Sequence, residues 1–495
     1  MIPVGLARTR PDYDGLTTPF GPGIDHPELA AVGLGPAPNE SPNHVYTAVR
    51  SALYGLGLDS ENYGRPEWNP LGELVSAGST IVLKPNWIRH WNPSDDGTLE
   101  SVITHGSVLR AVLDYAVLAA GPNGDVVIAE APQHDCRFDA IREQVGLEEL
   151  ERFYQHRLGR KLRIIDLRRE EVEYEKNIIV WRKTLPGDPL GYRLIDLGER
   201  SAFHDSGLNP QRFRGADYDP GPTTEHHQGG KHEYLLSETV LRADLVVNLP
   251  KLKTHKKTGV TLALKNLVGI NGDKNLLPHH CVGPESAGGD EFPGDRLLDR
   301  ARSQATEMAR VLLKHGVGTR LVGALRSVER AARGDDFIRS GNWYRNRTTW
   351  RMCLDLNRCL YYSSAAGEHW EAPEPVRRVL TVIDAVVAGE GEGPLAPTDR
   401  PLGVILASLD PVALDLAAIR LMGFDEECLP KVCEAMRSDV LRVTAARSPE
   451  DVVVREVVAA DAAPRERSLD ELVPEKPFVA HSGWLGHVEK TQCAA

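Results

Sequence analysis

The sequence has few cysteines, and none of them are spaced as ligands of a metal cluster usually are. Only 7 of its 495 residues are cysteine, and no CxxC pair occurs. A ferredoxin-type iron–sulfur cluster therefore has no ligand set. The N-terminus, MIPVGLARTRPDYDG, lacks the apolar core of a signal peptide. An odd number of scattered cysteines in such a chain is typical of reduced thiols, so we expect a cytoplasmic protein.

Several features of other protein classes are missing too. No run of about 20 apolar residues is present, so the sequence predicts no transmembrane helix. The chain has 58 Lys+Arg against 70 Asp+Glu, a net charge of -12, which argues against a nucleic-acid-binding protein. The glycine-rich pieces NLVGINGD and AGEGEGP match neither a phosphate loop nor a dinucleotide fingerprint, so no motif indicates ATP or NAD. The expected partner is a small molecule.

What is present from residue 79 onward is an alternation of apolar and amphipathic segments. STIVLKPNW (79–87), DVVIAEAP (125–132) and LRIIDL (162–167) are typical of buried strands, and residues 105–121 and 136–157 of helices. Strand, helix and strand at this spacing predict right-handed βαβ crossovers. The predicted fold class is α/β, a mostly parallel sheet with flanking helices plus a helical, aromatic insertion.

The chain is long enough for two or three folding units. We expect an irregular N-terminal lead-in at 1–75 around a helix-like segment at 45–56, a first α/β part of the core at 76–272 with a loop-rich insertion at 169–240, a helical insertion or lid at 273–375, a second α/β part at 376–446, and a polar tail at 447–495. The aromatic stretch of the insertion suits a lid or an oligomer surface equally, which leaves a homo-oligomer open. Its aromatic residues are Trp343, Tyr344, Trp350, Tyr361 and Tyr362.

A cluster of basic residues follows the apolar strand at 245–247. The chain breaks at Asn248 and Pro250 and then presents, over one turn, Lys251, Lys253, His255, Lys256 and Lys257. Ligands of open α/β sheets bind where strands end, and gathered cations repel one another unless an anion joins them. A solvated basic loop is the plain alternative. Because the chain as a whole is acidic, the cluster favours a pocket for a phosphate or carboxylate.

Other polar groups also follow predicted strands. Lys84 and Asn86 come after the apolar residues at 80–83, where Lys84 could equally be a surface lysine. His105 lies at the start of a helix, where capping alone would explain Thr104 beside it. Glu130 and Asp135 flank a histidine on one loop, which suits acid–base chemistry or a metal and equally a helix cap.

An acidic loop completes the set. Asp384 precedes Glu390 and Glu392, two glutamates separated by a glycine that could bend around a cation. A divalent metal ion, Mg²⁺ or another, is therefore a candidate cofactor. Two adjacent histidine pairs, at 226–227 and 279–280, lack metal-site spacing, and successive side chains diverge, so the pattern disfavours metal ligation by either pair.

Together these segments resemble the domain-of-unknown-function 362 family. The segments that carry the resemblance are VLKPNW (82–87), TH (104–105), IAEAP (128–132), DLVVNLPKLKTHKKTGVTLALKNLVGIN (244–271), VIDAVVAGEGEGP (382–394) and SLDPVALDLAA (408–418). They extend over roughly residues 79 to 425. Several members of the family carry an appended ferredoxin-like cluster domain. This chain lacks the cysteines for one, which puts an electron-transfer role in doubt.

The sequence thus predicts a biosynthetic enzyme acting on a small anionic metabolite, carboxylated or phosphorylated and sugar-like in one version of the hypothesis. The expected chemistry is group transfer or acid–base catalysis by a metal-assisted transferase, lyase or isomerase. The predicted site residues are Lys253, His255, Glu130 and Asp135 for catalysis, Lys84, Asn86, His105, Lys251, Lys265 and Asn266 for substrate binding, and Asp384, Glu390 and Glu392 for a metal.

Two alternatives stay open at this point. One is a racemase or epimerase in which His105 or His255 moves a proton beside a metal cofactor. The other is a non-enzymatic protein that binds an anionic ligand or acts as a scaffold. Both use the same basic cluster, so the sequence does not separate them from the group-transfer hypothesis.

Overall fold

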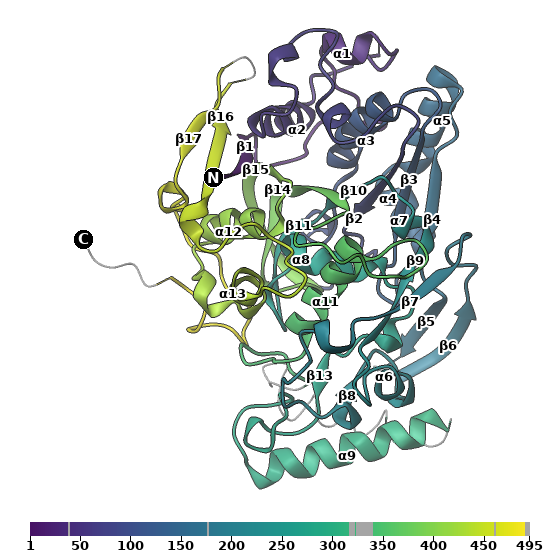
Figure 1. Ribbon diagram of the computed structural model, residues 1–495, viewed down its shortest axis with the longest axis vertical. Helices are drawn as coiled ribbons and strands as arrows, with labels where there is room; N and C mark the ends of the chain where they lie inside the picture. The colour runs from purple at the N-terminus through teal and green to yellow at the C-terminus, as the bar shows by residue number, and fades with distance from the viewer. Residues whose placement is uncertain (38–39, 176–177, 316–321, 323–339, 460–461, 491–495) are drawn as a thin grey trace.

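The fold is built on one large sheet (Figure 1). It is seen in a computed structural model that describes residues 1–37, 40–175, 178–315, 322, 340–459 and 462–490. The strand order is β17 (Arg465–Arg467), β16 (Val452–Val457), β1 (Ile2–Arg8), β15 (Ala396–Ser408), β14 (Arg378–Glu392), β10 (Leu245–Leu249), β2 (Thr80–Pro85), β3 (Asp125–Glu130) and β4 (Arg163–Asp166). The strands from β14 to β4 pair in parallel, whereas β15 is antiparallel to both of its neighbours. The α/β class with a mostly parallel sheet is confirmed.

The large sheet has one hydrophobic core on each face, and each central strand contributes side chains to both cores. On β2, Val82 packs into one core while Ile81 and Leu83 pack into the other, because successive side chains of a strand point to opposite faces. One face is covered by α2 (His44–Gly55), α3 (Gly106–Ala120) and α5 (Leu147–Leu158). The other is covered by α8 (Leu262–Asn266), α11 (Thr349–Tyr362), α12 (Pro411–Met422) and α13 (Pro430–Arg437). Strands buried on both faces are near-continuously apolar, as parallel sheets require.

One expected helix is split in two. The segment 136–157 forms α4 (Phe138–Gln144) and α5, separated by Gly146 in the left-handed conformation with φ of +69°. An added Cβ at Gly146 would lie 2.3 Å from Thr18 Cγ2. Glycine is therefore required at position 146 for two reasons, the left-handed backbone conformation and the close packing.

The N-terminal segment corrects the expectation of an irregular lead-in. β1 lies inside the sheet, between β15 and β16, and its Val4 and Leu6 are completely buried. The strand was missed because IPVGLAR contains a proline and a glycine, which both weaken a strand pattern. The glycine has a packing role: an added Cβ on Gly5 would lie 2.0 Å from the backbone oxygen of Ala52 in α2.

The rest of the N-terminal segment also has a core. After the short α1 (Pro27–Ala30) and α2, the aromatic rings of Tyr54 and Tyr63 stack at 3.6 Å, and Trp68 meets Tyr63 edge-on at 5.0 Å. The guanidinium of Arg50 lies over both Tyr63 and Trp68 and pairs with the buried Glu28 at 2.7 Å. These contacts fasten residues 1–75 to α3 through Tyr115, which meets Trp68.

The aromatic stretch of the insertion is core, so its buried rings do not form an oligomer surface, and the lid stays a prediction. Trp343, Trp350, Tyr361 and Tyr362 are all at most 8% exposed, and Tyr344 stacks on His487 of the C-terminal segment at 3.7 Å. The segment 447–495 is likewise more than a polar tail, since it supplies β16, β17 and the buried Trp484. α9 (Leu297–Lys314) lies at the periphery (Figure 1).

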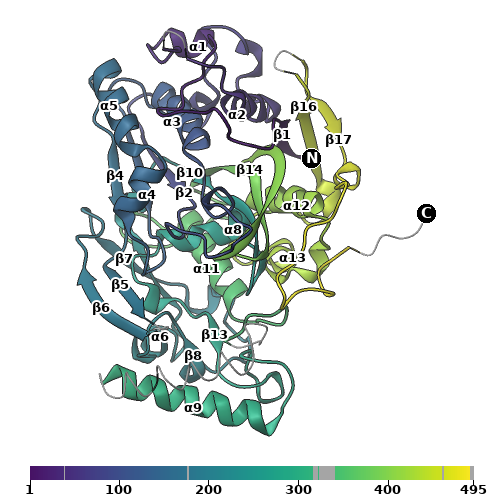
Figure 2. The same ribbon diagram turned by 180° about the vertical axis from the view of Figure 1, so that it is seen from behind.

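Small two-stranded sheets lie in the part of the molecule that contains α9, as the view from behind shows (Figure 2). β5 (Glu170–Glu175) pairs with β6 (Ile178–Thr184), β7 (Tyr192–Asp196) with β9 (Glu233–Ser237), and β8 (Phe213–Arg214) with β13 (His280–Cys281). The short helix α6 (Gly221–Glu225) lies between β8 and β9 in the chain, and α7 (Glu238–Leu241) leads from β9 to β10 of the large sheet. Within the described ranges, no helix is long and apolar enough to cross a membrane.

Leu6→Ala tests whether β1 belongs to the core. Removing a completely buried leucine side chain is expected to lower the free energy of unfolding by about 2–5 kcal/mol. The matched control is Leu298→Ala, because Leu298 is 70% exposed and its loss should change stability by no more than about 0.5 kcal/mol. Urea unfolding measures both. Equal effects of the two substitutions would contradict the placement of β1.

Candidate functional site

A cavity of about 310 Å³ lies at the carboxyl edge of the central strands. This volume is at the lower end of the range for small-molecule sites, about 300–1,000 Å³. Lys84 comes from the end of β2, and Glu130 is the last residue of β3. Lys265 and Asn266 come from α8. The basic residues that line the cavity are Lys84, Lys253, Lys256, Lys257, Lys265, Lys274 and Arg310, and Glu130 is the carboxylate among the described lining residues.

The basic cluster expected on a loop is partly a strand. β11 (Lys251–His255) pairs with β14 in parallel and with β12 (Gly259–Val260) antiparallel. The register with β14 is irregular between Lys251 and Lys253. Lys253 and His255 line the cavity, whereas Lys251 pairs with Asp384 of β14 at 2.9 Å. The strand fixes the backbone of the cluster, so its cations are held in place rather than solvated on a mobile loop.

Lys84 and Glu130 form a buried ion pair in the cavity wall. Lys84 Nζ also donates to Pro85 O at 2.9 Å and to Asn266 Oδ1 at 3.0 Å. Burial raises the pKa of Glu130 and lowers the pKa of Lys84, and each partner opposes the shift of the other. The pair depends on Gly269, because a Cβ there would lie 2.0 Å from Glu130 Oε1.

Lys253 is the most strongly perturbed lysine of the cavity. Its Nζ donates to Val102 O, and burial followed by the charges of Lys251, Lys265 and Lys84 lowers its pKa well below the usual value. Lys274 Nζ donates to Ala131 O at 2.8 Å, and burial lowers its pKa to about 7. Such surroundings disfavour the protonated form of a lysine, and its neutral form can act as a base or nucleophile.

Two histidines of the cavity have opposite tautomers. His255 Nδ1 accepts from the backbone nitrogens of Lys257 and Thr258 at 3.1 and 3.2 Å, and burial lowers its pKa well below the usual value. The proton of this neutral ring is therefore on Nε2. In His279, whose pKa burial lowers to about 3, the carbonyl of Leu277 lies 2.8 Å from Nδ1. A carbonyl only accepts, so His279 carries its proton on Nδ1 and has a free lone pair on Nε2.

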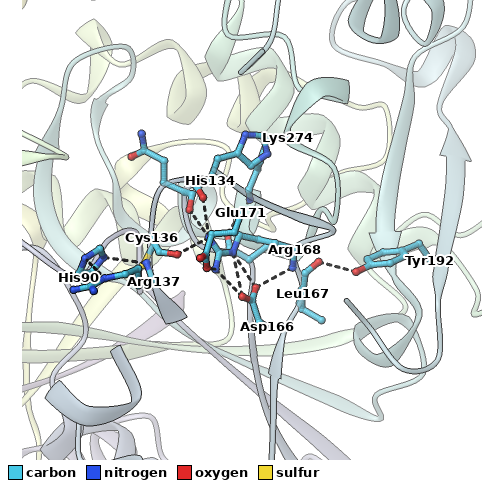
Figure 3. A network of polar contacts seen from close by, with 12 residues as sticks. His90, His134, Cys136, Arg137, Asp166, Leu167, Arg168, Glu171, Tyr192 and Lys274 are labelled. Atoms are coloured by element: carbon cyan, nitrogen blue, oxygen red, sulfur yellow. Dashed lines mark hydrogen bonds and ion pairs between the residues drawn. The ribbon is translucent and has the colours of Figure 1, made fainter. Parts of the chain in front are cut away.

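Arg168 holds the loop that follows β3 through a network of polar contacts (Figure 3). It donates to the backbone oxygens of Gln133, His134 and Cys136 at 2.7–3.1 Å, and its other nitrogens pair with Asp166 and with Glu171. The loop backbone thereby has partners away from the sheet, and Gln133 and His134 are held at the cavity wall.

Some predicted site residues lie elsewhere. Asp135 is not part of the cavity lining, and its Oδ2 accepts from Arg89 at 3.1 Å. His105, Lys251 and Asp384 form a second buried cluster with Tyr13. Lys251 donates to Tyr13 at 3.0 Å, Tyr13 donates to Asp384 at 2.5 Å, and the ring of His105 stacks on Tyr13 at 3.8 Å. This cluster fastens the N-terminal segment to β14.

The predicted metal ligands are also engaged separately. Asp384 pairs with Lys251, Glu390 accepts from the backbone nitrogen of Val479 at 2.9 Å, and Glu392 pairs with His481 at 2.9 Å. Among the residues that the structure describes, no group of three or more His, Cys, Asp or Glu side chains could hold a metal ion. The structure thus does not gather Asp384, Glu390 and Glu392 into such a group.

The structure adds several lining residues that were not among the predicted site residues, notably Lys274, Lys257, Thr261, His279 and Gln133. His279 and Lys257 had been noted in the sequence only as members of a histidine pair and of the basic cluster. Lys274 and Thr261 come directly after, or lie within, the basic segment. Proximity to that segment was the available signal, but no periodicity distinguished these residues from ordinary loop residues.

Gly269→Ala tests the contact between the buried ion pair and its neighbouring turn. The new methyl group would collide with Glu130 and Lys84, so we expect a loss of about 1–3 kcal/mol in the free energy of unfolding. Gly35→Ala is the matched control, because a Cβ there meets atoms no nearer than 3.6 Å. Urea unfolding compares the two, and a Gly269→Ala protein as stable as the control would contradict the geometry.

Comparison with known proteins places the basic segment within a family. Residues 175–420 match the family described as domain of unknown function (DUF362). This range includes the segments 244–271, 382–394 and 408–418 that carried the resemblance, but it begins after the segments at 82–132. The expected range of about 79 to 425 is thus wider than the match.

One curated relative is the thylakoid-associated protein sll1697 of Synechocystis sp., which is 21% identical over 225 residues. The aligned region covers 46% of this chain and 45% of the relative, so the comparison spans less than half the length of either protein. The family resemblance seen in the sequence is confirmed: residues 175–420 of this chain are a domain of the DUF362 family.

Proposed function

We propose that this protein is a biosynthetic enzyme of the cytoplasm whose substrate, a small carboxylated or phosphorylated metabolite, binds in the lysine-rich cavity. The observation that carries the proposal is the imbalance of charge. Six lysines line the cavity together with Arg310, which pairs with Glu307, and Glu130 is the carboxylate among the described lining residues. The six described cysteines are all free thiols, as is usual in the reducing cytoplasm.

The buried cations need an anion for an energetic reason. Removing several ammonium groups from water is costly, and Glu130 offsets one positive charge. The pKa values of Lys253, Lys265 and Lys274 are all lowered by burial, so the empty cavity favours losing protons. A bound carboxylate or phosphate would restore the charged forms and would gain several short, charge-assisted hydrogen bonds.

The same groups suit proton transfer or covalent group transfer. We assign Lys253 the part of base or nucleophile, because its neighbours disfavour its protonated form. His255 would donate from Nε2 to an oxygen of the substrate, and the other lysines would hold its anionic group. A divalent cation that arrives with a phosphate could use Glu130. His105 lies outside the cavity lining, so the racemase alternative retains His255 as its proton carrier.

Binding of an anion is expected to take up protons. An anion beside Lys274, whose pKa is about 7, favours the charged form and raises that pKa, so protons enter with the ligand. Affinity for inorganic phosphate, corrected for its own ionisation, should therefore rise as the pH falls from about 9 to about 7. Calorimetry in buffers of different ionisation enthalpy measures the uptake. Lys274→Met should reduce it, and binding without any proton uptake would contradict the proposal.

Lys253→Met tests the chemical part of the proposal. Purified protein is incubated with the small-molecule fraction of a cell extract, and mass spectrometry follows anionic metabolites that are consumed or formed. We expect the substitution to slow the conversion at least about 100-fold, as loss of a base or nucleophile does. Lys231→Met is the matched control, because the Lys231 side chain is 54% exposed. Full turnover by Lys253→Met would overturn the assigned role, and tight anion binding without any turnover would favour a binding protein.

A further inference from the structure

The cavity wall contains a chain of side-chain amides whose orientations are fixed at both ends. Asn248 Nδ2 donates to Ala263 O at 3.1 Å, so Asn248 Oδ1 accepts from Asn266 Nδ2 at 2.8 Å. At the other end, Lys84 Nζ lies 3.0 Å from Asn266 and can only donate, so the Asn266 atom that it meets is Oδ1. Both ends give the same orientation of Asn266.

The orientation of Asn86 follows from this chain. Its amide lies 2.8 Å from Asn266 Oδ1, an atom that only accepts, so the Asn86 atom facing it is the donor Nδ2. Asn86 Oδ1 is therefore the atom left over. It is buried and has no hydrogen-bond partner, although Asn86 belongs to the cavity lining and is only 6% exposed. This buried carbonyl oxygen has a fixed orientation and can accept a hydrogen bond from a ligand.

Two further acceptors belong to the same wall. Thr261, 3% exposed, has a buried hydroxyl oxygen without a hydrogen-bond partner. His279 has a free lone pair on Nε2, because its Nδ1 donates to Leu277. Beside them, Lys265 is buried, and its Nζ forms no ion pair or hydrogen bond with the described residues. The cavity thus offers a positive charge and hydrogen-bond acceptors together.

A simple anion would pair with the lysines of this wall but would leave its hydrogen-bond acceptors without a donor. A carboxylate or phosphate on an alkyl chain would pair with the lysines but would bring no donor to Asn86 Oδ1 or His279 Nε2. Water can serve these acceptors in the empty cavity, and a ligand that displaces it without replacing the hydrogen bonds loses affinity. A site with polar groups placed for a hydroxyl rejects an analogue that lacks it.

We infer that the ligand of this cavity is a polyhydroxylated anion, a sugar acid or sugar phosphate, whose hydroxyl groups donate to Asn86 Oδ1 and its neighbouring acceptors while its anionic group meets the lysines. The inference rests on the proposed function, because it takes the cavity to be the substrate site. It goes further in naming hydroxyl groups as a requirement for binding and Asn86 as the residue that selects for them.

The experiment compares ligands that differ only in their hydroxyl groups. Calorimetry with the full chain measures the affinity for gluconate against hexanoate and for glucose 6-phosphate against hexyl phosphate, with inorganic phosphate as the reference anion. In at least one pair, the hydroxylated ligand is expected to bind at least about tenfold more tightly, since each buried acceptor left unpaired weakens binding by about that factor. Whichever pair binds also identifies the anionic group.

Two variants separate the recognition of hydroxyl groups from the binding of the anionic group. Asn86→Leu should reduce the preference for the hydroxylated ligand, whereas Lys265→Met should weaken both members of a pair by a similar factor. Equal binding of hydroxylated and plain anions by the unchanged protein would overturn this inference and leave the anion site intact. If inorganic phosphate and all four organic anions failed to bind, the proposed function itself would be overturned and this inference with it.

Discussion

The buried ion pair of Lys84 and Glu130 is the interaction on which the arrangement of the cavity depends. These residues end neighbouring parallel strands, β2 and β3, and meet at the carboxyl edge of the sheet. Both side chains are buried, and each charge offsets part of the cost of burying the other. Through Asn266 the same lysine orients the amide chain that crosses to β10. One ion pair therefore links three strands and fixes the donors and acceptors that face a ligand.

The remaining lysines show how a protein of net negative charge can present a strongly cationic cavity. β11 carries Lys253 into the site on a paired strand, and α8 brings Lys265 to the same wall. The acidic residues of the following β14 are used elsewhere, because Asp384 pairs with Lys251 on the side of Tyr13. Among the described lining residues the cations thus outnumber the carboxylate Glu130, whereas Lys251 and Asp384 form a pair that holds the chain together.

The secondary structure of the core could be read from the sequence wherever one physical signal dominated. Apolar runs located β2, β3, β4 and β10, and the helical periodicity ending at Gly121 located α3. The prediction failed at β1, where Gly5 is required by the backbone of α2 and obscures the strand pattern. It also missed the burial of the aromatic residues of α11, because the polar residues between them have partners that only the folded chain supplies. Asp355, for example, accepts from Ser201 and Tyr234.

The sequence by itself determined the fold class, the family resemblance and some of the segments that line the cavity. Hydrophobic patterning acts locally, and the carboxyl ends of parallel strands necessarily share one edge. Only the tertiary structure decided which polar residues at that edge face the cavity. Lys251 and Lys253 are two residues apart, yet an irregular register with β14 sends one to Asp384 and the other to the ligand side. Such choices depend on partners more than a hundred residues away, and local pattern contains no information about them.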